Sequence, residues 1–318
     1  MTVAVSPLVP VFPVALQVAE ERARVRFLEF FTAQIRNPNT RRSYAKAAIE
    51  FLHWCELRGA TSLPAITPMH VAGWIEEMTG THAAPTVKQR LAAVRHLFDW
   101  LVTGQVMPTN PAHSVRGPAH SRRSGKTPVL APEEARRLLD SIPTDTLIGK
   151  RDRALIGLMT FTFARIGAAT AMETRDVYAQ NRRLWVRLHE KGGKQAELPC
   201  HHTLEAYLDD YIEAASLRDT SRAPLFQTIK RGTSRLSGSP LPSRDALAMV
   251  QRRALAAGID TAVCNHTFRA TGITAYLKNG GTLEKAAHMA NHSSTRTTQL
   301  YDRRHDDVSL DEIERILI

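Results

Sequence analysis

A histidine and an arginine stand three residues apart in the stretch HTFRATG, as His266 and Arg269. Residues three apart on a helix are neighbours, so two cationic side chains here would repel each other unless an anion lies between them. Asn265 or Thr267 is suited to cap the start of this helix, and the free N–H groups of a first turn also attract anions. A phosphate fits this pattern. On this motif alone, a solvated basic helix face is the alternative.

Other side chains that can do chemistry lie before and after this motif. Arg165 follows an apolar helical run, Lys191 precedes a Gly-Gly turn, and His292 stands nine residues before Tyr301. Each has an ordinary structural explanation: a helix-end arginine, an exposed turn lysine and a core tyrosine. His288 and His292 have the i, i+4 spacing of metal ligands, but HMANH lacks the glutamate of H-E-x-x-H and a third ligand. We therefore expect no metal site.

The order and spacing of these residues resemble the tyrosine recombinase (phage integrase) superfamily. The signature of that family is an arginine, a hairpin lysine, an H-x-x-R, a histidine or tryptophan, and then a tyrosine. Six positions fill it in order: Arg165, Lys191, His266, Arg269, His292 and Tyr301. The resemblance extends over residues 20–318 and implies an N-terminal helical domain and a C-terminal catalytic domain.

The resemblance implies transesterification at a DNA phosphate, without metal, ATP or any other cofactor. Arg165 and Arg269 would clamp the non-bridging oxygens as negative charge develops on them. His266 and His292 would donate hydrogen bonds to the same group, and His266 would also exchange a proton with the nucleophile. Two cations on one helix would then have the scissile phosphate between them.

Tyr301 and Lys191 complete this implied chemistry. Tyr301 would attack the phosphorus atom, forming a 3′-phosphotyrosine, and Lys191 would protonate the leaving 5′-oxygen. One position departs from the family pattern: the usual acidic residue three positions after the first arginine is Ala168 here. In the family picture that acid supports its neighbours, so the departure bears on how the pocket is held and on the balance of cleavage and religation.

The overall charge favours a polyanionic partner, nucleic acid before membrane. Lys and Arg number 42 against 31 Asp and Glu, which gives a net charge of +11 and a pI near 9.9. Three scattered cysteines fit a reducing interior and no disulfide framework, so we expect a cytoplasmic protein. The apolar opening is interrupted by three prolines and lacks a basic n-region, so we expect neither a signal peptide nor a membrane span.

We expect a mainly α protein with a small antiparallel β-hairpin or sheet in its C-terminal domain, an α+β fold organised as a two-domain DNA clamp. No acidic residue occurs between Asp99 and Glu133, where Pro, Gly and Ser are frequent, which predicts a basic linker. The expected segments are a flexible arm (1–19), a helical core-binding domain (20–112), the linker (113–127), a catalytic domain (128–308) and a C-terminal helix (309–318).

Local signals predict several element boundaries. Thr67 before Pro68 predicts a helix start, and Thr86 and Gln89 have capping-box spacing. Alternating residues on both sides of Gly192-Gly193 predict a hairpin with Lys191 at its tip. Two helices show apolar stripes: Tyr44, Ala48, Phe51, Leu52 and Cys55 in one, and Val87, Leu91, Val94, Phe98 and Leu101 in the other.

Basic side chains in the helical domain and the linker are candidates for contacts with the DNA backbone, with a solvated surface as the alternative. These candidates are Arg41, Arg42, Lys88, Arg90, Arg116, Arg122 and Arg123.

The resemblance implies a site-specific recombinase that acts as a homo-tetramer on double-stranded DNA with inverted half-sites. It would pass through a Holliday junction during integration, excision or resolution of a mobile element. The C-terminal helix is too short to be stable alone, and the family implies that it docks on a neighbouring protomer. Two alternatives are a type IB topoisomerase that relaxes DNA as a monomer, and a DNA-binding regulator with a relic site.

Overall fold

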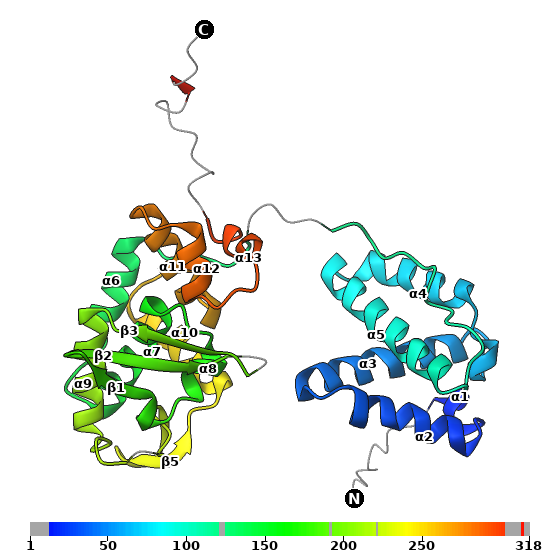
Figure 1. The fold of residues 1–318 in the computed structure, drawn as a ribbon, viewed down its shortest axis with the longest axis horizontal. Coiled ribbons are helices and arrows are strands. Elements are labelled where there is room, and N and C mark those ends of the chain that lie inside the picture. The colour runs from blue at the N-terminus through cyan, green and yellow to red at the C-terminus, as the bar shows by residue number, and fades with distance from the viewer. Residues whose placement is uncertain (1–12, 121–124, 191–192, 221, 303–312, 315–318) are drawn as a thin grey trace, which may run out of the picture. The chain divides into compact units, whose positions relative to one another are not determined.

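The computed structural model describes residues 13–120, 125–190, 193–220, 222–302 and 313–314. The chain forms two compact units, residues 1–121 and 122–318, and their division falls inside the predicted basic linker. Figure 1 shows a helical first unit and a second unit that combines helices with short strands. The predicted fold class is confirmed: the protein is mainly helical, with small antiparallel sheets in the second unit.

The first unit is built from helices only, within its described residues. They are α1 (Val14–Gln17), α2 (Glu21–Glu29), the π-helix η1 (Phe30–Gln34), α3 (Pro38–Glu56), the 3₁₀-helix η2 (Leu63–Ala65), α4 (Pro68–Thr81) and α5 (Ala84–Thr103). The predicted stripe of α5 is buried throughout, and so is that of α3 except for the half-buried Tyr44. These two stripes form much of the core of this unit.

The helix starts follow local chemistry, with one correction. Thr67 caps α4 as predicted, and its N–H donates to Nδ1 of His70 at 3.1 Å. The predicted capping box of Thr86 and Gln89 is wrong. α5 begins at Ala84, two residues before Thr86. Pro85 lies in its first turn, where the fixed φ of proline suits a helix. The Gln89 amide instead donates to Oγ of Ser43 on α3 at 2.9 Å.

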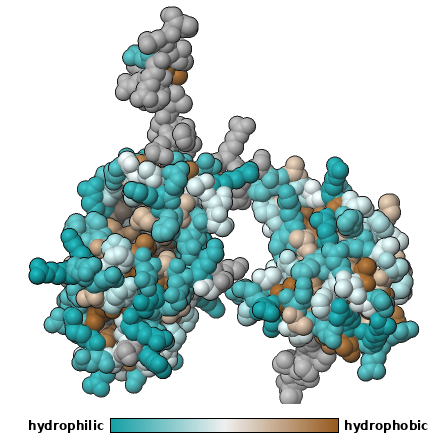
Figure 2. All heavy atoms as spheres, viewed as in Figure 1, coloured by the Kyte–Doolittle hydropathy of each residue, from teal (hydrophilic) through white to brown (hydrophobic). Residues whose placement is uncertain are grey.

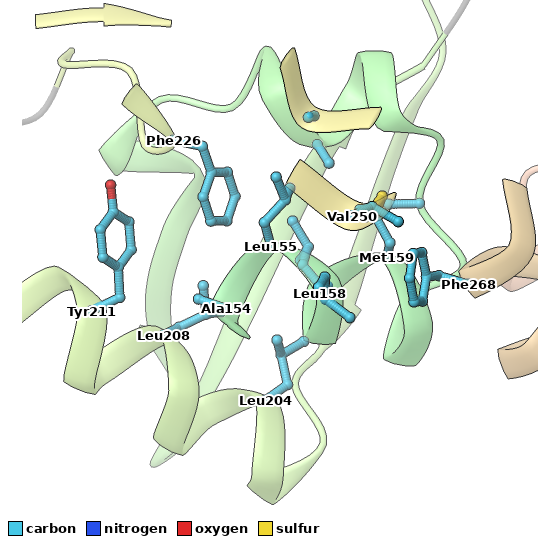
Figure 3. Packing of buried hydrophobic residues seen from close by; sticks show 14 of the residues in the cluster. Ala154, Leu155, Leu158, Met159, Leu204, Leu208, Tyr211, Phe226, Val250 and Phe268 are labelled. Atoms are coloured by element: carbon cyan, nitrogen blue, oxygen red, sulfur yellow. The ribbon is translucent and has the colours of Figure 1, made fainter. Parts of the chain in front are cut away.

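The second unit contains the remaining elements. They are α6 (Pro132–Asp140), α7 (Leu147–Phe161), α8 (Ile166–Thr170), η3 (Thr174–Asp176), β1 (Val177–Gln180), β2 (Arg183–His189), β3 (Gln195–Pro199), α9 (His202–Ala214), β4 (Gln227–Ile229), β5 (Leu236–Pro240), α10 (Ser243–Ala256), α11 (Asn265–Lys278), α12 (Leu283–Met289) and α13 (Thr295–Gln299). Figure 3 shows its core, in which Ala154 and Leu158 of α7 face Leu208 and Leu204 of α9.

The predicted hairpin is present as β2 and β3, and it belongs to a larger sheet. β1, β2 and β3 pair antiparallel in that order, with Val186 opposite Leu198. Val186 and Leu188 of β2 are buried, which matches the predicted alternation. The four-residue β1 and the β4–β5 pair were not predicted from the sequence, because strands this short show too few alternations to reveal a period of two.

A close approach between α7 and α11 places the helix that carries Arg269. At Gly272 of α11, an added Cβ atom would lie 2.0 Å from the carbonyl oxygen of Thr160 on α7. Only glycine permits this spacing. α11 then packs on α12, and α12 packs on α13, so that these three helices lie together at one end of the unit (Figure 1).

Hydrophilic residues dominate the face of both units that Figure 2 shows. No helix within the described ranges is long and apolar enough to span a bilayer. The predicted C-terminal helix falls outside the described residues apart from Ile313 and Glu314, and so does the predicted arm apart from 13–19.

Candidate active site

Arg269 lies at the centre of the candidate site, and its side chain is held by backbone oxygens. It projects from α11, is 1% exposed, and donates to the carbonyl oxygens of Phe163 and Ala290. Nη2 of Arg269 also donates to Nε2 of His292 at 2.7 Å. Burial, and then the positive charge of Arg165, lower the pKa of Arg269 to about 10. Carbonyl groups and a histidine therefore fix this cation in place.

The start of α11 differs from the predicted cap. Cys264 is the N-cap residue, and its N–H donates to Oγ1 of Thr267 at 3.0 Å. Neither Asn265 nor Thr267 occupies the cap position, since both lie inside the first turn. His266 also lies in that turn with an exposed side chain, whereas Arg269 points inward. Desolvation, followed by the charges of Arg269 and Arg165, lowers the pKa of His266.

His292 has both ring nitrogens engaged. Because a guanidinium only donates, Nε2 of His292 accepts from Arg269, and the ring proton lies on Nδ1. Nδ1 then donates to Oγ1 of Thr298, 2.8 Å away. Burial, and then the charges of Arg269 and Arg165, lower the pKa of His292 to about 4. His292 is therefore a neutral imidazole at pH 7.

Tyr301 stacks on His292 and is fixed through its backbone. The two rings are nearly parallel, with their planes 8° apart and their centroids 5.9 Å apart. The Tyr301 carbonyl accepts from Oγ1 of Thr274 on α11 at 2.9 Å. The preceding carbonyl, of Leu300, accepts from the N–H of Gly125 at 2.8 Å. The candidate nucleophile is thus held by α11 and, through Leu300, by the C-terminal end of the linker.

Arg165 immediately precedes α8 and pairs with a buried carboxylate. Its Nη1 donates to Oε2 of Glu190, the residue that follows β2. The Glu190 side chain is 4% exposed, whereas that of Arg165 is 34% exposed. The charge of Arg165 lowers the pKa values of Arg269, His266 and His292, which shows that these four groups share one electrostatic environment.

Lys191 lies outside the described residues, but the strands before and after it, β2 and β3, are described. The N–H of Glu190 donates to the carbonyl of Lys194 at 2.7 Å. Lys191 is therefore bonded directly to the residue that pairs with Arg165.

The candidate DNA contacts differ in how free their side chains are. Lys88, Arg42 and Arg116 are exposed. Arg90 is half-buried and pairs with Glu50, and the guanidinium of Arg41 donates to the carbonyl of Ile35 at 3.0 Å. The contact between Gln89 and Ser43 brings the regions of Lys88 and Arg42 together on α5 and α3. The remaining candidates, Arg122 and Arg123, lie outside the described residues.

The part of the chain that the structure describes holds no cluster of three or more His, Cys, Asp or Glu suited to a metal ion. His288 is exposed, while His292 faces Arg269, so the two histidines do not form a ligand pair.

Several residues of the site were not identified from the sequence. Glu190, Thr298 and the carbonyls of Phe163 and Ala290 contact the predicted residues directly. Glu190 could have been identified from the sequence, because it is an acidic residue directly before the predicted hairpin lysine. No sequence signal indicated the two carbonyls. Phe163 has a φ of 56°, a left-handed conformation that aromatic residues rarely adopt and that no sequence pattern predicts.

Comparison with known proteins covers both units. The phage integrase family model matches residues 128–307, and the model of the phage integrase N-terminal SAM-like domain matches residues 25–105. Tyrosine recombinase XerC of Myxococcus xanthus is 26% identical over 283 residues, which cover 86% of this chain and 91% of the relative. Tyrosine recombinase XerD of Chlorobaculum tepidum is 28% identical over 287 residues, which cover 86% and 89%.

Solved structures share the fold at low sequence identity. XerH site-specific recombinase bound to palindromic difH substrate superposes with a TM-score of 0.70 at 18% identity, over 96% of this chain and 95% of that one. A lambda integrase tetramer bound to a Holliday junction gives a TM-score of 0.65 at 16% identity, over 90% and 79% of the two chains.

Proposed function

This chain belongs to the phage integrase family of tyrosine recombinases, and from that premise we propose which residues carry its strand-exchange chemistry and how it assembles on DNA. The observation that supports the proposal is the grouping of two arginines, a neutral histidine and a tyrosine at one site. Arg269 contacts His292, His292 stacks on Tyr301, and the charge of Arg165 acts on the first two.

In the cleavage step, Oη of Tyr301 attacks the scissile phosphorus, and the bond to the 5′-oxygen breaks. Arg165 and Arg269 stabilise the negative charge that develops on the non-bridging oxygens. His266, the exposed histidine of the pair, takes the proton from the tyrosine hydroxyl. Lys191 gives a proton to the leaving 5′-oxygen. The products are a 3′-phosphotyrosine and a free 5′-hydroxyl.

His292 acts in two ways in this scheme. It accepts from Arg269, which helps to orient that guanidinium, and it stacks against the nucleophile. To donate to the phosphate, Nε2 of His292 must leave Arg269 and gain a proton. Positive neighbours disfavour that proton until a phosphate adds negative charge to the pocket.

Rejoining reverses the same chemistry with a different strand. A 5′-hydroxyl from the second duplex attacks the phosphotyrosine and releases Tyr301, so the phosphodiester bond energy is conserved and no nucleotide cofactor is consumed. Exchange of one pair of strands in this way forms a Holliday junction, and exchange of the second pair resolves it.

We place this chemistry in a homo-tetramer on two duplexes with inverted half-sites, in the cytosol. The proposal is supported by the palindromic substrate of XerH and by the lambda integrase tetramer on a Holliday junction. Residues 309–318 dock on a neighbouring protomer in this assembly. The biological outcome is integration, excision or resolution of a mobile element.

A covalent trapping experiment tests this function. Full-length protein is mixed with a pool of nicked duplexes whose central sequence is randomised, so that cleavage loses the 5′-hydroxyl fragment and the adduct accumulates. Wild-type protein should form adducts at a consensus with inverted half-sites, and Tyr301→Phe should bind the same DNA without forming any. The phenylalanine ring retains the stack on His292, so the variant loses only the nucleophilic oxygen.

The outcome also separates the alternatives. Adducts without strand exchange between two duplexes would indicate a topoisomerase. Binding to DNA without any adduct would indicate a regulator. An adduct that survives Tyr301→Phe would place the nucleophile elsewhere.

A further inference from the structure

The pairing of Arg165 with Glu190 has no counterpart in the sequence pattern that identified the site. The carboxylate of Glu190 is 4% exposed and accepts from Nη1 of Arg165. A carboxylate at this depth requires a partner, because an unpaired buried charge is costly. Within the described part of the chain, Arg165 is the group that supplies it.

The position three residues after Arg165 offers no such carboxylate. Ala168 is 5% exposed, and its methyl group can neither accept a hydrogen bond nor carry charge. The hairpin thus provides the acid that the helix after Arg165 lacks. Both positions are buried near Arg165: Ala168 lies on α8, and Glu190 directly follows β2.

The pairing leaves the phosphate-binding capacity of Arg165 intact. A guanidinium has five N–H donors, and Glu190 takes the one from Nη1 that the contact records. The Arg165 side chain remains 34% exposed, so a face of it is open to a ligand. Glu190 therefore contacts the arginine from its buried side.

We propose that Glu190 is a positioning residue for Arg165 and that it replaces the acid absent at Ala168. The inference rests on the proposed function, since it concerns how Arg165, one of its phosphate-binding groups, is held. Glu190 directly follows β2, and its N–H donates to the carbonyl of Lys194 at 2.7 Å, so the backbone of the hairpin fixes the position of the carboxylate.

The experiment compares Glu190→Ala and Glu190→Gln with Glu197→Gln in the full-length protein. Glu197 is a matched control, because it lies on the same hairpin and pairs with an arginine, Arg187, away from the site. The first readout is the rate constant of adduct formation on the duplex recovered by trapping, measured at saturating protein. Glu190→Ala should lower this rate constant about 100-fold, which is the effect of misplacing a group by about 1 Å.

Glu190→Gln tests whether position alone matters. Glutamine has the same shape and keeps an acceptor oxygen, so it should restore the rate constant to within about tenfold of wild type. Glu197→Gln should leave it unchanged within about twofold, and all three variants should retain wild-type affinity for DNA. A rate constant for Glu190→Ala equal to that of wild type would overturn the inference. A faster one would also overturn it, by showing that the carboxylate competes with the phosphate.

A second readout does not depend on recombination. In protein labelled with ¹⁵N-arginine, the side-chain signal of Arg165, assigned by its absence from Arg165→Lys, should show hindered rotation of the guanidinium group. Glu190→Ala should abolish that hindrance, and Glu197→Gln should not. An unchanged signal would refute the pairing even if the enzyme is active. If wild-type protein forms no adduct while the signal responds as expected, the proposed function fails and the pairing stands.

Discussion

The neutral state of His292 depends on its neighbours and decides how the pocket responds to pH. Its ring lies against Arg269 and within the field of Arg165, so a proton on Nε2 would face two positive charges. The same nitrogen accepts a hydrogen bond that a protonated ring could not accept. Protonation of His292 at low pH should therefore destabilise the folded protein locally and break the hydrogen bond that His292 accepts from Arg269.

This gives a prediction for stability against pH. The pKa of His292 is lowered from 6.5 to about 4 on folding, so between these values the unfolded chain binds a proton that the folded chain does not. The free energy of unfolding should fall as pH drops from 6.5 towards 4. Urea titrations across this range should show a shallower fall for His292→Gln. His288→Gln, which changes an exposed histidine, is the control, and identical pH profiles for both variants would contradict the assignment.

A second prediction at this scale concerns Lys191. Lys191→Ala should slow adduct formation by about 10²–10⁴-fold, the usual contribution of a general acid, because the 5′-oxygen then leaves as an alkoxide. A duplex with sulfur at the 5′-bridging position should restore most of the rate, since a thiolate leaves without a proton. Single-turnover assays on the two duplexes measure this. Equal defects on both would assign Lys191 another role.

The sequence predicted the residue types of the site better than their surroundings. The order from Arg165 to Tyr301 was recognisable because each side chain has a distinct chemistry at a fixed spacing. The groups that hold Arg269 are carbonyls of residues 106 and 21 positions away in the chain, and carbonyls leave no trace in residue identity. Glu190 carried a readable charge, but its burial and its aim at Arg165 are properties of the fold.

At the scale of elements, the contact between α7 and α11 sets the position of Arg269. Gly272 allows the α11 backbone to approach Thr160 and the ring of Phe163, and the carbonyl of Phe163 accepts from Arg269. The predicted helices that fall within the described residues were confirmed because their apolar stripes are long, and the hairpin was confirmed because alternating residues flank its Gly-Gly pair. This contact was not predicted, since a glycine inside a helix does not reveal which helix it faces.

Gly272→Ala should therefore destabilise the protein by about 1–3 kcal/mol, the usual cost of overpacking, and should also displace Arg269. Thermal unfolding and the rate of adduct formation are the two measurements. The matched control is Gly167→Ala in α8, where an added Cβ meets no atom within 4 Å. That change should be neutral or stabilising by up to about 1 kcal/mol. Equal effects of the two substitutions would show that the close approach of α7 and α11 does not penalise an added methyl group at position 272.

At the scale of the whole molecule, the basic surface is expected to govern binding to DNA. Each phosphate that a lysine or arginine neutralises releases counterions, so affinity should fall with salt at a log–log slope of about −0.9 per contact. Replacing Arg122 and Arg123 together by alanine should flatten that slope by up to about two units, on specific and random DNA alike. Salt titrations of half-site affinity measure this. Coincident slopes would show that the linker charge is only solvated.

The structure adds a graded control to this titration. Lys88→Ala removes an exposed cation and should flatten the slope by about one unit. Arg90 is already paired with Glu50, so Arg90→Ala should change the slope less. A larger effect for Arg90 than for Lys88 would mean that the ion pair opens on DNA.

The hydrogen bond between Gly125 and Leu300 has a mechanical consequence. It joins Gly125, near the C-terminal end of the linker, to the residue directly before Tyr301, and any side chain at position 125 would come within 2.4 Å of the Leu300 oxygen. The C-terminal end of the linker is thus attached directly beside the candidate nucleophile. A displacement of Gly125 is therefore expected to be transmitted to the backbone of Tyr301.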